Sequence, residues 1–181
     1  MDPLDIYSKY YSSGSDAYKI LYTHSRSVAD KALSLVRMHP EMNLNPTFIE
    51  EAALLHDIGV FLCNAPGIDC HGEADYICHG YLGAGLLRRE EGLEKHALVC
   101  ERHTGSGITL KEIIERNMPL PHREMVPVTV EEKLICFADK FFSKSHLEKE
   151  KNIDQIKKSL SKYGSDSLSR FENMCKLFLG E

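Results

Sequence analysis

The chain has 181 residues, enough for one domain with a sizeable core, and its apolar content of 43% and charged content of 27% are ordinary for a globular protein. No stretch approaches the roughly 18 consecutive apolar residues of a membrane-spanning helix, and the N-terminus does not resemble a secretory signal. The formal net charge of -5 argues against broad nucleic-acid binding but allows a local basic pocket for a phosphate group.

The six cysteines form no Cys-x-x-Cys pair, so free thiols in a reducing compartment are the expected state. We therefore predict a cytoplasmic protein that acts on a small molecule and has no membrane partner. The sequence leaves the oligomeric state open, with a homodimer as one option.

Helix signals cover most of the N-terminal half. Asp2-Pro3 can cap a short first helix, and the apolar residues of the second keep helical spacing. His24 lies within the apolar stripe of this second helix. Asn45-Pro46 starts a third helix, whose apolar run ends at His56-Asp57. The predicted helices of this half span residues 2–11, residues 16–38 and the segment from 45 to about 57.

The C-terminal half continues this pattern after a loop at residues 60–73. Further helices are expected at residues 74–91 and 93–103, after the capping boxes at Thr109 and Thr129, and in two charged segments that end near Gly164 and Gly180. The helix that starts after Thr129 carries Asp139. Only residues 126–128 show any strand alternation, and Pro127 counts against a strand there. The sequence therefore predicts an all-α, single-domain helical bundle over residues 1–181.

Six residues of metal-binding type lie on or at the ends of these helices, beside apolar residues. In chain order they are His24, His56, Asp57, His79, His103 and Asp139. The adjacent pair at the end of an apolar run is the strongest signal, because a buried carboxylate is costly unless it is paired or binds a metal. Each other histidine, taken alone, is more often an ordinary core or surface residue, so the ordered set carries the argument.

Imidazole nitrogen and carboxylate oxygen suit divalent ions, with iron favoured here and manganese, zinc, magnesium, cobalt or nickel as alternatives. Six ligands exceed what one tetrahedral zinc needs, and they would suffice for two ions if Asp57 bridges them. Two ions about 3.5–4 Å apart can hold a bridging hydroxide and bind a phosphoryl oxygen. His56 and Asp57 are therefore also the predicted catalytic residues.

Two other groups of residues allow further interpretations. Cys70-His71 and Cys78-His79 repeat at a spacing of eight, and a structural zinc that also uses Cys63 is one alternative. His96 follows two charged residues and is expected to lie on the surface.

Leu54-Leu55-His56-Asp57-Ile58-Gly59 matches the HDIG signature, and Phe137-Ala138-Asp139-Lys140 resembles a closing aspartate motif. With His24 before them, these segments resemble the HD superfamily of metal-dependent phosphohydrolases. The surroundings of His79 and His103 are similar to the branch with two extra metal-binding histidines. The resemblance covers about residues 22–143, and residues 145–181 are expected to form helices that pack on this part.

The resemblance implies one metal held by His24, His56, Asp57 and Asp139, and a second held by Asp57, His79 and His103. It also implies hydrolysis of a phosphate ester or anhydride, of a nucleotide or a related small phosphorylated metabolite. Several binuclear branches have a lysine directly after the signature, where this chain has Val60. That lysine and the Gly-Tyr-Pro signature of the cyclic-dinucleotide phosphodiesterases are both absent, which argues against that branch.

Phosphate binding would need cations or amides near the metals. The predicted substrate contacts are Arg102, His122, Arg123 and Lys140, and Arg26 and Lys144 are further candidates. Any one of these cations, taken alone, is more often a solvated surface residue.

Two other functions compete with hydrolysis. Some relatives of this fold use the same six ligands as a mixed-valent di-iron oxygenase that cleaves a C–C or C–P bond, and ligand order does not separate the two reactions. A metal-stabilised binding or regulatory module without turnover is the third interpretation.

Overall fold

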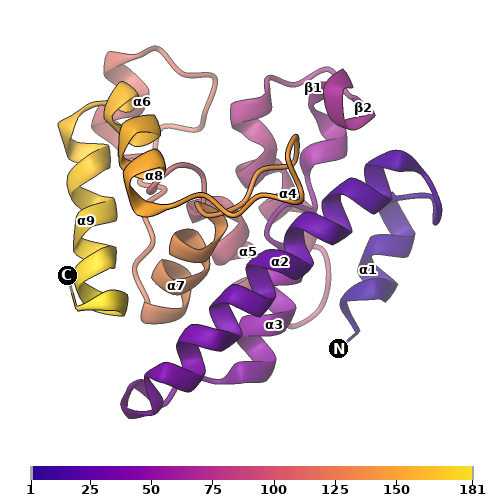
Figure 1. Ribbon diagram of the computed structural model, residues 1–181. Coiled ribbons are helices and arrows are strands. Elements are labelled where there is room, and N and C mark those ends of the chain that lie inside the picture. The colour runs from indigo at the N-terminus through magenta and orange to yellow at the C-terminus, as the bar shows by residue number, and fades with distance from the viewer. Residues whose placement is uncertain (1, 181) are drawn as a thin grey trace.

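The longest helix, α2 (Asp16–Met38), runs along one side of the molecule (Figure 1). His24 lies on its buried face. Ser15 caps this helix: its side-chain oxygen accepts a hydrogen bond from the Tyr18 amide, as expected for serine at this position. The computed structural model describes residues 2–180, so the two ends of the predicted domain, Met1 and Glu181, lie outside the described residues.

Helices make up most of the rest of the described chain, which confirms the all-α prediction. The other elements are α1 (Pro3–Tyr10), α3 (Pro46–Leu55), β1 (Asn64–Ala65), β2 (Cys70–His71), α4 (His79–Leu87), α5 (Glu94–Arg102), α6 (Leu110–Glu115), α7 (Val130–Asp139), α8 (Ile153–Leu160) and α9 (Ser165–Leu179). Within residues 2–180, the only sheet is the antiparallel pair β1–β2, with Asn64 opposite His71. No helix in that range has the length and apolar character needed to cross a membrane.

Two predicted segments differ in detail. The expected loop at residues 60–73 contains the β1–β2 hairpin, whose strands of two residues are too short to show alternation in a sequence. The helix expected at residues 74–91 is shorter, because a 3₁₀ turn at Tyr76–Cys78 precedes α4 and turns follow it. Gly92 completes these turns with a positive φ of 78°.

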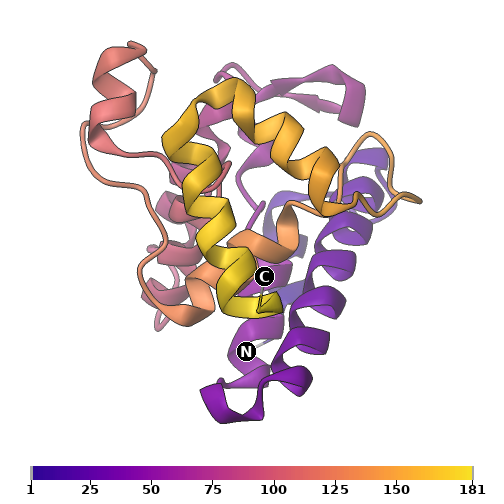
Figure 2. The same cartoon turned by 60° about the vertical axis from the view of Figure 1, so that its left-hand side comes forward.

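The main core lies where α3 and α7 meet α2 and the two C-terminal helices. Phe137 of α7 is fully buried, and its ring centroid lies 5.4 Å from Phe171 and 5.5 Å from Phe178 of α9. Burial of each such side chain contributes on the order of 1.5–3 kcal/mol. Figure 2 shows α8 and α9 covering the side of the molecule that carries α7. The C-terminal helices therefore hold α7, which ends at Asp139, in place.

Gly59 and Gly83 let α4 approach the end of α3 very closely. A Cβ atom on Gly59 would lie 2.4 Å from both the Gly83 nitrogen and the His79 carbonyl oxygen. Only glycine fits such an approach without displacing the backbone. The glycine of the signature therefore sets how near His79 comes to Asp57.

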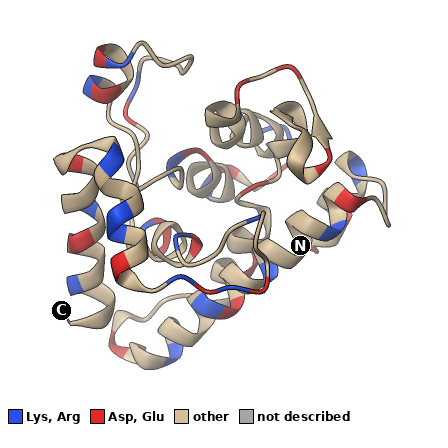
Figure 3. Cartoon of the chain, turned by 45° about the horizontal axis from the view of Figure 1, so that its top comes forward, with Lys and Arg blue, Asp and Glu red and all other residues tan. Residues whose placement is uncertain are grey.

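The connection between α7 and α8 crosses the molecule as an irregular segment and passes over the ends of the core helices (Figure 1). A hydrogen bond from the Lys151 amide to the carbonyl of Phe141, two residues after α7, joins the two ends of this segment. Figure 3 shows acidic and basic residues interspersed along the helices next to the C-terminus. The lysines of the connection come close to the ligand cluster, as described below.

Candidate metal centre

All six residues predicted as metal ligands come together in the interior. They form two groups that share Asp57, one with His24, His56 and Asp139 and the other with His79 and His103. All six are buried, with Asp139 the most exposed at 9%. The ligands come from α2, the end of α3, the start of α4, the end of α5 and the end of α7. Packing of these helices, rather than a flexible loop, fixes the positions of the ligands.

The two oxygens of Asp57 face different pairs of histidines. Oδ2 lies 3.2 Å from Nε2 of His24 and 3.1 Å from Nε2 of His56. Oδ1 lies 3.3 Å from Nε2 of His79 and 3.4 Å from Nε2 of His103. Asp139 completes the first group, with its Oδ1 3.0 Å from Nε2 of His24. The carboxylate of Asp57 therefore has the placement of a ligand that bridges two ions.

Three of the histidines are oriented by the same local contact. The Nδ1 atoms of His56, His79 and His103 lie 2.6–2.7 Å from the carbonyl oxygens of residues 53, 76 and 100, three positions earlier in each case. His56 and His103 directly follow helices, where carbonyls lack an intrahelical partner. Because a carbonyl can only accept, each Nδ1 carries a proton, and a neutral ring then presents a lone pair at Nε2.

Unsatisfied atoms in the centre fit bound cations. Nε2 of His79 and Nε2 of His103 lie 3.1 Å apart, so two lone pairs face each other when both rings are neutral. Nε2 of His56 and Oδ1 of Asp57 are buried without a hydrogen bond of good geometry. Donor atoms about 2.1 Å from one ion lie about 3.0–3.4 Å from each other, which is the spacing seen here. The donor set therefore fits two divalent metal ions.

The two groups differ in charge. Burial lowers the pKa of His79 to about 3 and also lowers the pKa of His103. For His56, burial also favours the neutral ring, but the adjacent Asp57 and Asp139 outweigh it and raise the pKa to about 9. Burial would raise the pKa of Asp57, yet His56 and Lys144 hold it well below its usual range. The second group is thus ready to bind a cation, whereas the first must release a proton.

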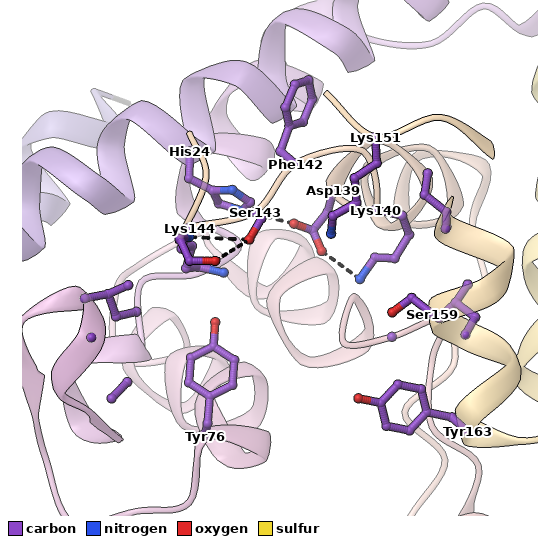
Figure 4. A pocket seen from close by; sticks show the side chains of 17 residues that line it. His24, Tyr76, Asp139, Lys140, Phe142, Ser143, Lys144, Lys151, Ser159 and Tyr163 are labelled. Atoms are coloured by element: carbon purple, nitrogen blue, oxygen red, sulfur yellow. Dashed lines mark hydrogen bonds and ion pairs between the residues drawn. The ribbon is translucent and has the colours of Figure 1, made fainter. Parts of the chain in front are cut away.

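Two lysines from the end of α7 and the connection after it reach the carboxylates. Nζ of Lys140 lies 2.7 Å from Oδ2 of Asp139, and Nζ of Lys144 lies 2.6 Å from Oδ2 of Asp57. Both lysines line a pocket of about 530 Å³ that opens beside the metal centre. Figure 4 shows Lys140 directed toward Asp139, and the rings of Tyr76 and Tyr163 on the opposite wall. The pocket thus combines ligands, cations and aromatic rings.

Of the predicted substrate contacts, Lys140 lines this pocket and the others do not. Arg102 donates to both carboxylate oxygens of Glu132, at 2.9 and 3.1 Å. Arg123 donates to Glu101, a buried residue that also accepts from Arg88. His122 is exposed, and Arg26 is paired with Asp30 and Glu50. The arginine charges are therefore balanced by carboxylates away from the pocket.

The structure also resolves the remaining histidine and cysteine interpretations. The surface prediction for His96 is wrong: it is 7% exposed, and its Nε2 lies 3.2 Å from Glu51 while its ring packs 4.9 Å from that of Phe48. Charged neighbours in the sequence concealed its position on the buried face of α5. The six cysteines are buried, and no metal-binding group among residues 2–180 includes Cys63, Cys70 or Cys78.

Sequence reasoning did not single out four residues that line the pocket: Tyr76, Lys151, Ser159 and Tyr163. Tyr76 is 40% exposed although its ring centroid lies 4.7 Å from that of the ligand His79. Because Tyr76 lies three residues before His79, about one helical turn, its sequence position could have indicated that it lies near the metal centre. The other three come from the connection and from the segment around α8, and nothing in their sequence pattern points to the pocket.

Comparison with known proteins agrees with this geometry. The family model for the HD domain matches residues 21–143, the segment that contains all six ligands. This chain belongs to the HD-domain family. The matched segment contains the helices that carry the candidate ligands, and residues 145–181 lie outside it. No solved structure matches the chain.

Relatives of this HD-domain protein have been found in archaea. The uncharacterized protein MJ0778 of Methanocaldococcus jannaschii is 34% identical over 142 residues, which cover 77% of this chain and 76% of that protein. A tRNA (cytidine(56)-2'-O)-methyltransferase of Thermoplasma volcanium is 26% identical over 98% of this chain but only 47% of its own length. The methyltransferase of the same name from Picrophilus torridus is 31% identical over 66% of this chain and 30% of its own. This chain thus spans half or less of each methyltransferase.

Proposed function

We propose that this protein is a metal-dependent phosphohydrolase that uses two divalent ions. The observation that carries the proposal is the placement of Asp57, whose two oxygens face two separate pairs of histidine nitrogens. Two such ions supply a hydroxide nucleophile at neutral pH and stabilise the charge on the phosphoryl oxygens. His24, His56, Asp57 and Asp139 would hold one ion, and His79 and His103 would hold the other together with Asp57.

The lysines beside this centre support an anionic substrate. Lys140 and Lys144 lie on the wall of the pocket, and their side chains are only 13% exposed. A partly desolvated ammonium group binds a phosphoryl oxygen more strongly than one in bulk water. We assign to these two lysines the binding of phosphoryl oxygens that the metals leave free. Some related enzymes have a lysine at the position of Val60. In this chain Lys144, in the α7–α8 connection, supplies a cation instead.

The size of the pocket favours a small substrate. A volume of about 530 Å³ falls within the range of small-molecule sites, roughly 300–1,000 Å³. We therefore propose a phosphorylated metabolite of nucleotide size as the substrate, cleaved at a phosphate ester or anhydride bond. Iron is the preferred metal in this proposal, and the cytoplasm is the expected location.

A phosphatase screen with controlled metal content tests this function. The protein is stripped with a chelator, reloaded separately with iron(II), manganese, cobalt, nickel, zinc or magnesium, and assayed on nucleotides and simple phosphate monoesters. We expect phosphate release with at least one metal and none from the stripped protein. Absence of phosphate release from every metal form would contradict the proposal.

The oxygenase alternative is separated by repeating the iron assay with and without dioxygen. A hydrolase releases phosphate at the same rate in both atmospheres, because water is its only co-substrate. Turnover that requires dioxygen would replace our proposal with oxidative cleavage of a C–C or C–P bond.

A further inference from the structure

A second, smaller cavity adjoins the pocket beside the metal centre. Its volume is about 220 Å³, and Tyr76, Gly105 and Tyr163 line both spaces. These three residues therefore form the boundary between the two. On the far side, the apolar part of the wall comes from Ile77, Ile108 and Met118. Ile108 belongs to a small buried cluster against which the other two pack.

Two of the charged groups that line the second cavity, Arg170 and Glu112, form an ion pair. Arg170 donates to both oxygens of Glu112 at 2.8 Å and to the Gly107 carbonyl at 2.9 Å. Arg116 donates to the Tyr163 carbonyl. Glu112 thus balances the charge of Arg170, whereas Arg116 is an exposed residue that donates to a neutral carbonyl, and the remaining wall is largely apolar. Its chemistry suits an uncharged, largely apolar group.

The boundary lies one side chain away from the metal ligands. The ring centroid of Tyr76 is 4.7 Å from that of His79, and Nζ of Lys144 lies 5.7 Å from the Tyr76 centroid. Tyr76 and Tyr163 are 40% and 55% exposed, and Figure 4 shows both rings at the pocket wall below Lys144 and Ser159. A molecule whose phosphate contacts the lysines can thus place its other end beside these two rings.

We propose that the second cavity binds the flat, apolar ring of a phosphate monoester whose phosphate lies at the metal centre. An apolar cavity of about 150 Å³ accepts benzene, so 220 Å³ has room for a bicyclic ring. Tyr76 and Tyr163 offer aromatic faces against which such a ring can stack. This inference rests on the proposed function and adds a preference for esters that carry a ring system.

Two phosphonates that resist hydrolysis test this subsite by calorimetry on the manganese-loaded protein. They are 1-naphthylmethylphosphonate and methylphosphonate, which share the anionic group and differ in the ring. We expect the naphthyl compound to bind at least about tenfold more tightly, as is usual for an apolar group that enters a matching pocket. Equal affinities for the two compounds would overturn the subsite.

The variant Met118→Trp should fill the cavity and reduce the difference between the two compounds to less than about threefold. Met38→Trp is the matched control, because Met38 is 64% exposed and lines neither space, and it should retain the full difference. If Met118→Trp fails to fold by circular dichroism, Tyr163→Ala removes part of the boundary instead and should weaken only the naphthyl compound. An unchanged difference in the folded variants would contradict the subsite.

Failure of the subsite and failure of the enzyme activity are distinguishable in these measurements. Equal phosphonate affinities together with phosphate release from esters would leave the hydrolase and remove the subsite. A retained difference in affinity without ester hydrolysis by any metal form would contradict the proposed function instead.

Discussion

The metal centre and the pocket wall beside it are built in different ways. Each of the six ligands lies on or directly beside an α-helix of the core, and backbone carbonyls orient three of the four histidines. Much of the wall comes instead from the irregular connection after α7 and from the residues around α8. A ligand substitution should therefore act on the whole centre, whereas a substitution in the wall should change binding in a graded way.

Loss of the bridging carboxylate should have the largest effect. Asp57→Ala removes the one ligand shared by both groups and the negative charge between two cations, which then repel each other more strongly. We expect a folded protein that binds little metal and has no measurable turnover. Metal analysis, circular dichroism and the phosphatase assay check this.

Asp30→Ala is the control for this substitution, since Asp30 forms only an exposed pair with Arg26. It should retain metal and activity. If Asp57→Ala kept near-normal metal content and rate, the two-metal interpretation would be wrong, and His56-Asp57 would be an ordinary helix end.

Loss of the second histidine group should abolish turnover but leave one ion. The double variant His79→Ala/His103→Ala retains all four ligands of the first group, so bound metal should fall by about one equivalent. Metal analysis after gel filtration measures this. The control His71→Ala/His122→Ala changes two exposed histidines and should bind as much metal as the unmodified protein. Unchanged metal content in the first variant would mean that the site holds a single ion.

On the wall, Lys144→Ala should weaken substrate binding rather than metal binding. A charge-assisted hydrogen bond contributes roughly 1.5–3 kcal/mol, so KM should rise about tenfold to a hundredfold. Steady-state kinetics, with metal content measured alongside, checks this. Arg123→Ala should stay within about twofold of the unmodified protein, because Arg123 is paired with Glu101 outside the pocket. A larger rise in KM for Arg123→Ala than for Lys144→Ala would indicate that Arg123, and not Lys144, contacts the phosphate.

The pH dependence of metal affinity should differ between the two groups, and the change over a single pH unit is the smallest of these effects. The pKa of His56 is raised to about 9 by Asp57 and Asp139 against the effect of burial, so the first ion must displace a proton at neutral pH. Its affinity should rise about tenfold for each pH unit between 6.5 and 8.5. The pKa of His79 is lowered to about 3 by burial, so binding at the second group needs no such release.

Competition with a chromophoric chelator at several pH values resolves the two affinities. Equal pH slopes for both ions would show that the two groups do not differ in protonation as described.

The structure brings together all six residues that the sequence singled out as candidate ligands, whereas the sequence predicted less of the pocket wall, for a physical reason. His24 and Asp139 lie at helical spacing from buried neighbours, so periodicity places them on inward faces. Lys144 and Tyr163 belong to short or irregular segments, where no period relates sequence position to direction. Arg123 was predicted to contact the substrate, but it pairs with the buried Glu101. Nothing in the sequence indicated this ion pair.

The most direct test of the account is an anomalous-scattering map from crystals grown with manganese. We expect two peaks about 3.5–4 Å apart with Asp57 between them, one beside His24, His56 and Asp139 and the other beside His79 and His103. A single peak in the presence of saturating manganese, or two peaks that do not share Asp57, would contradict the two-metal centre.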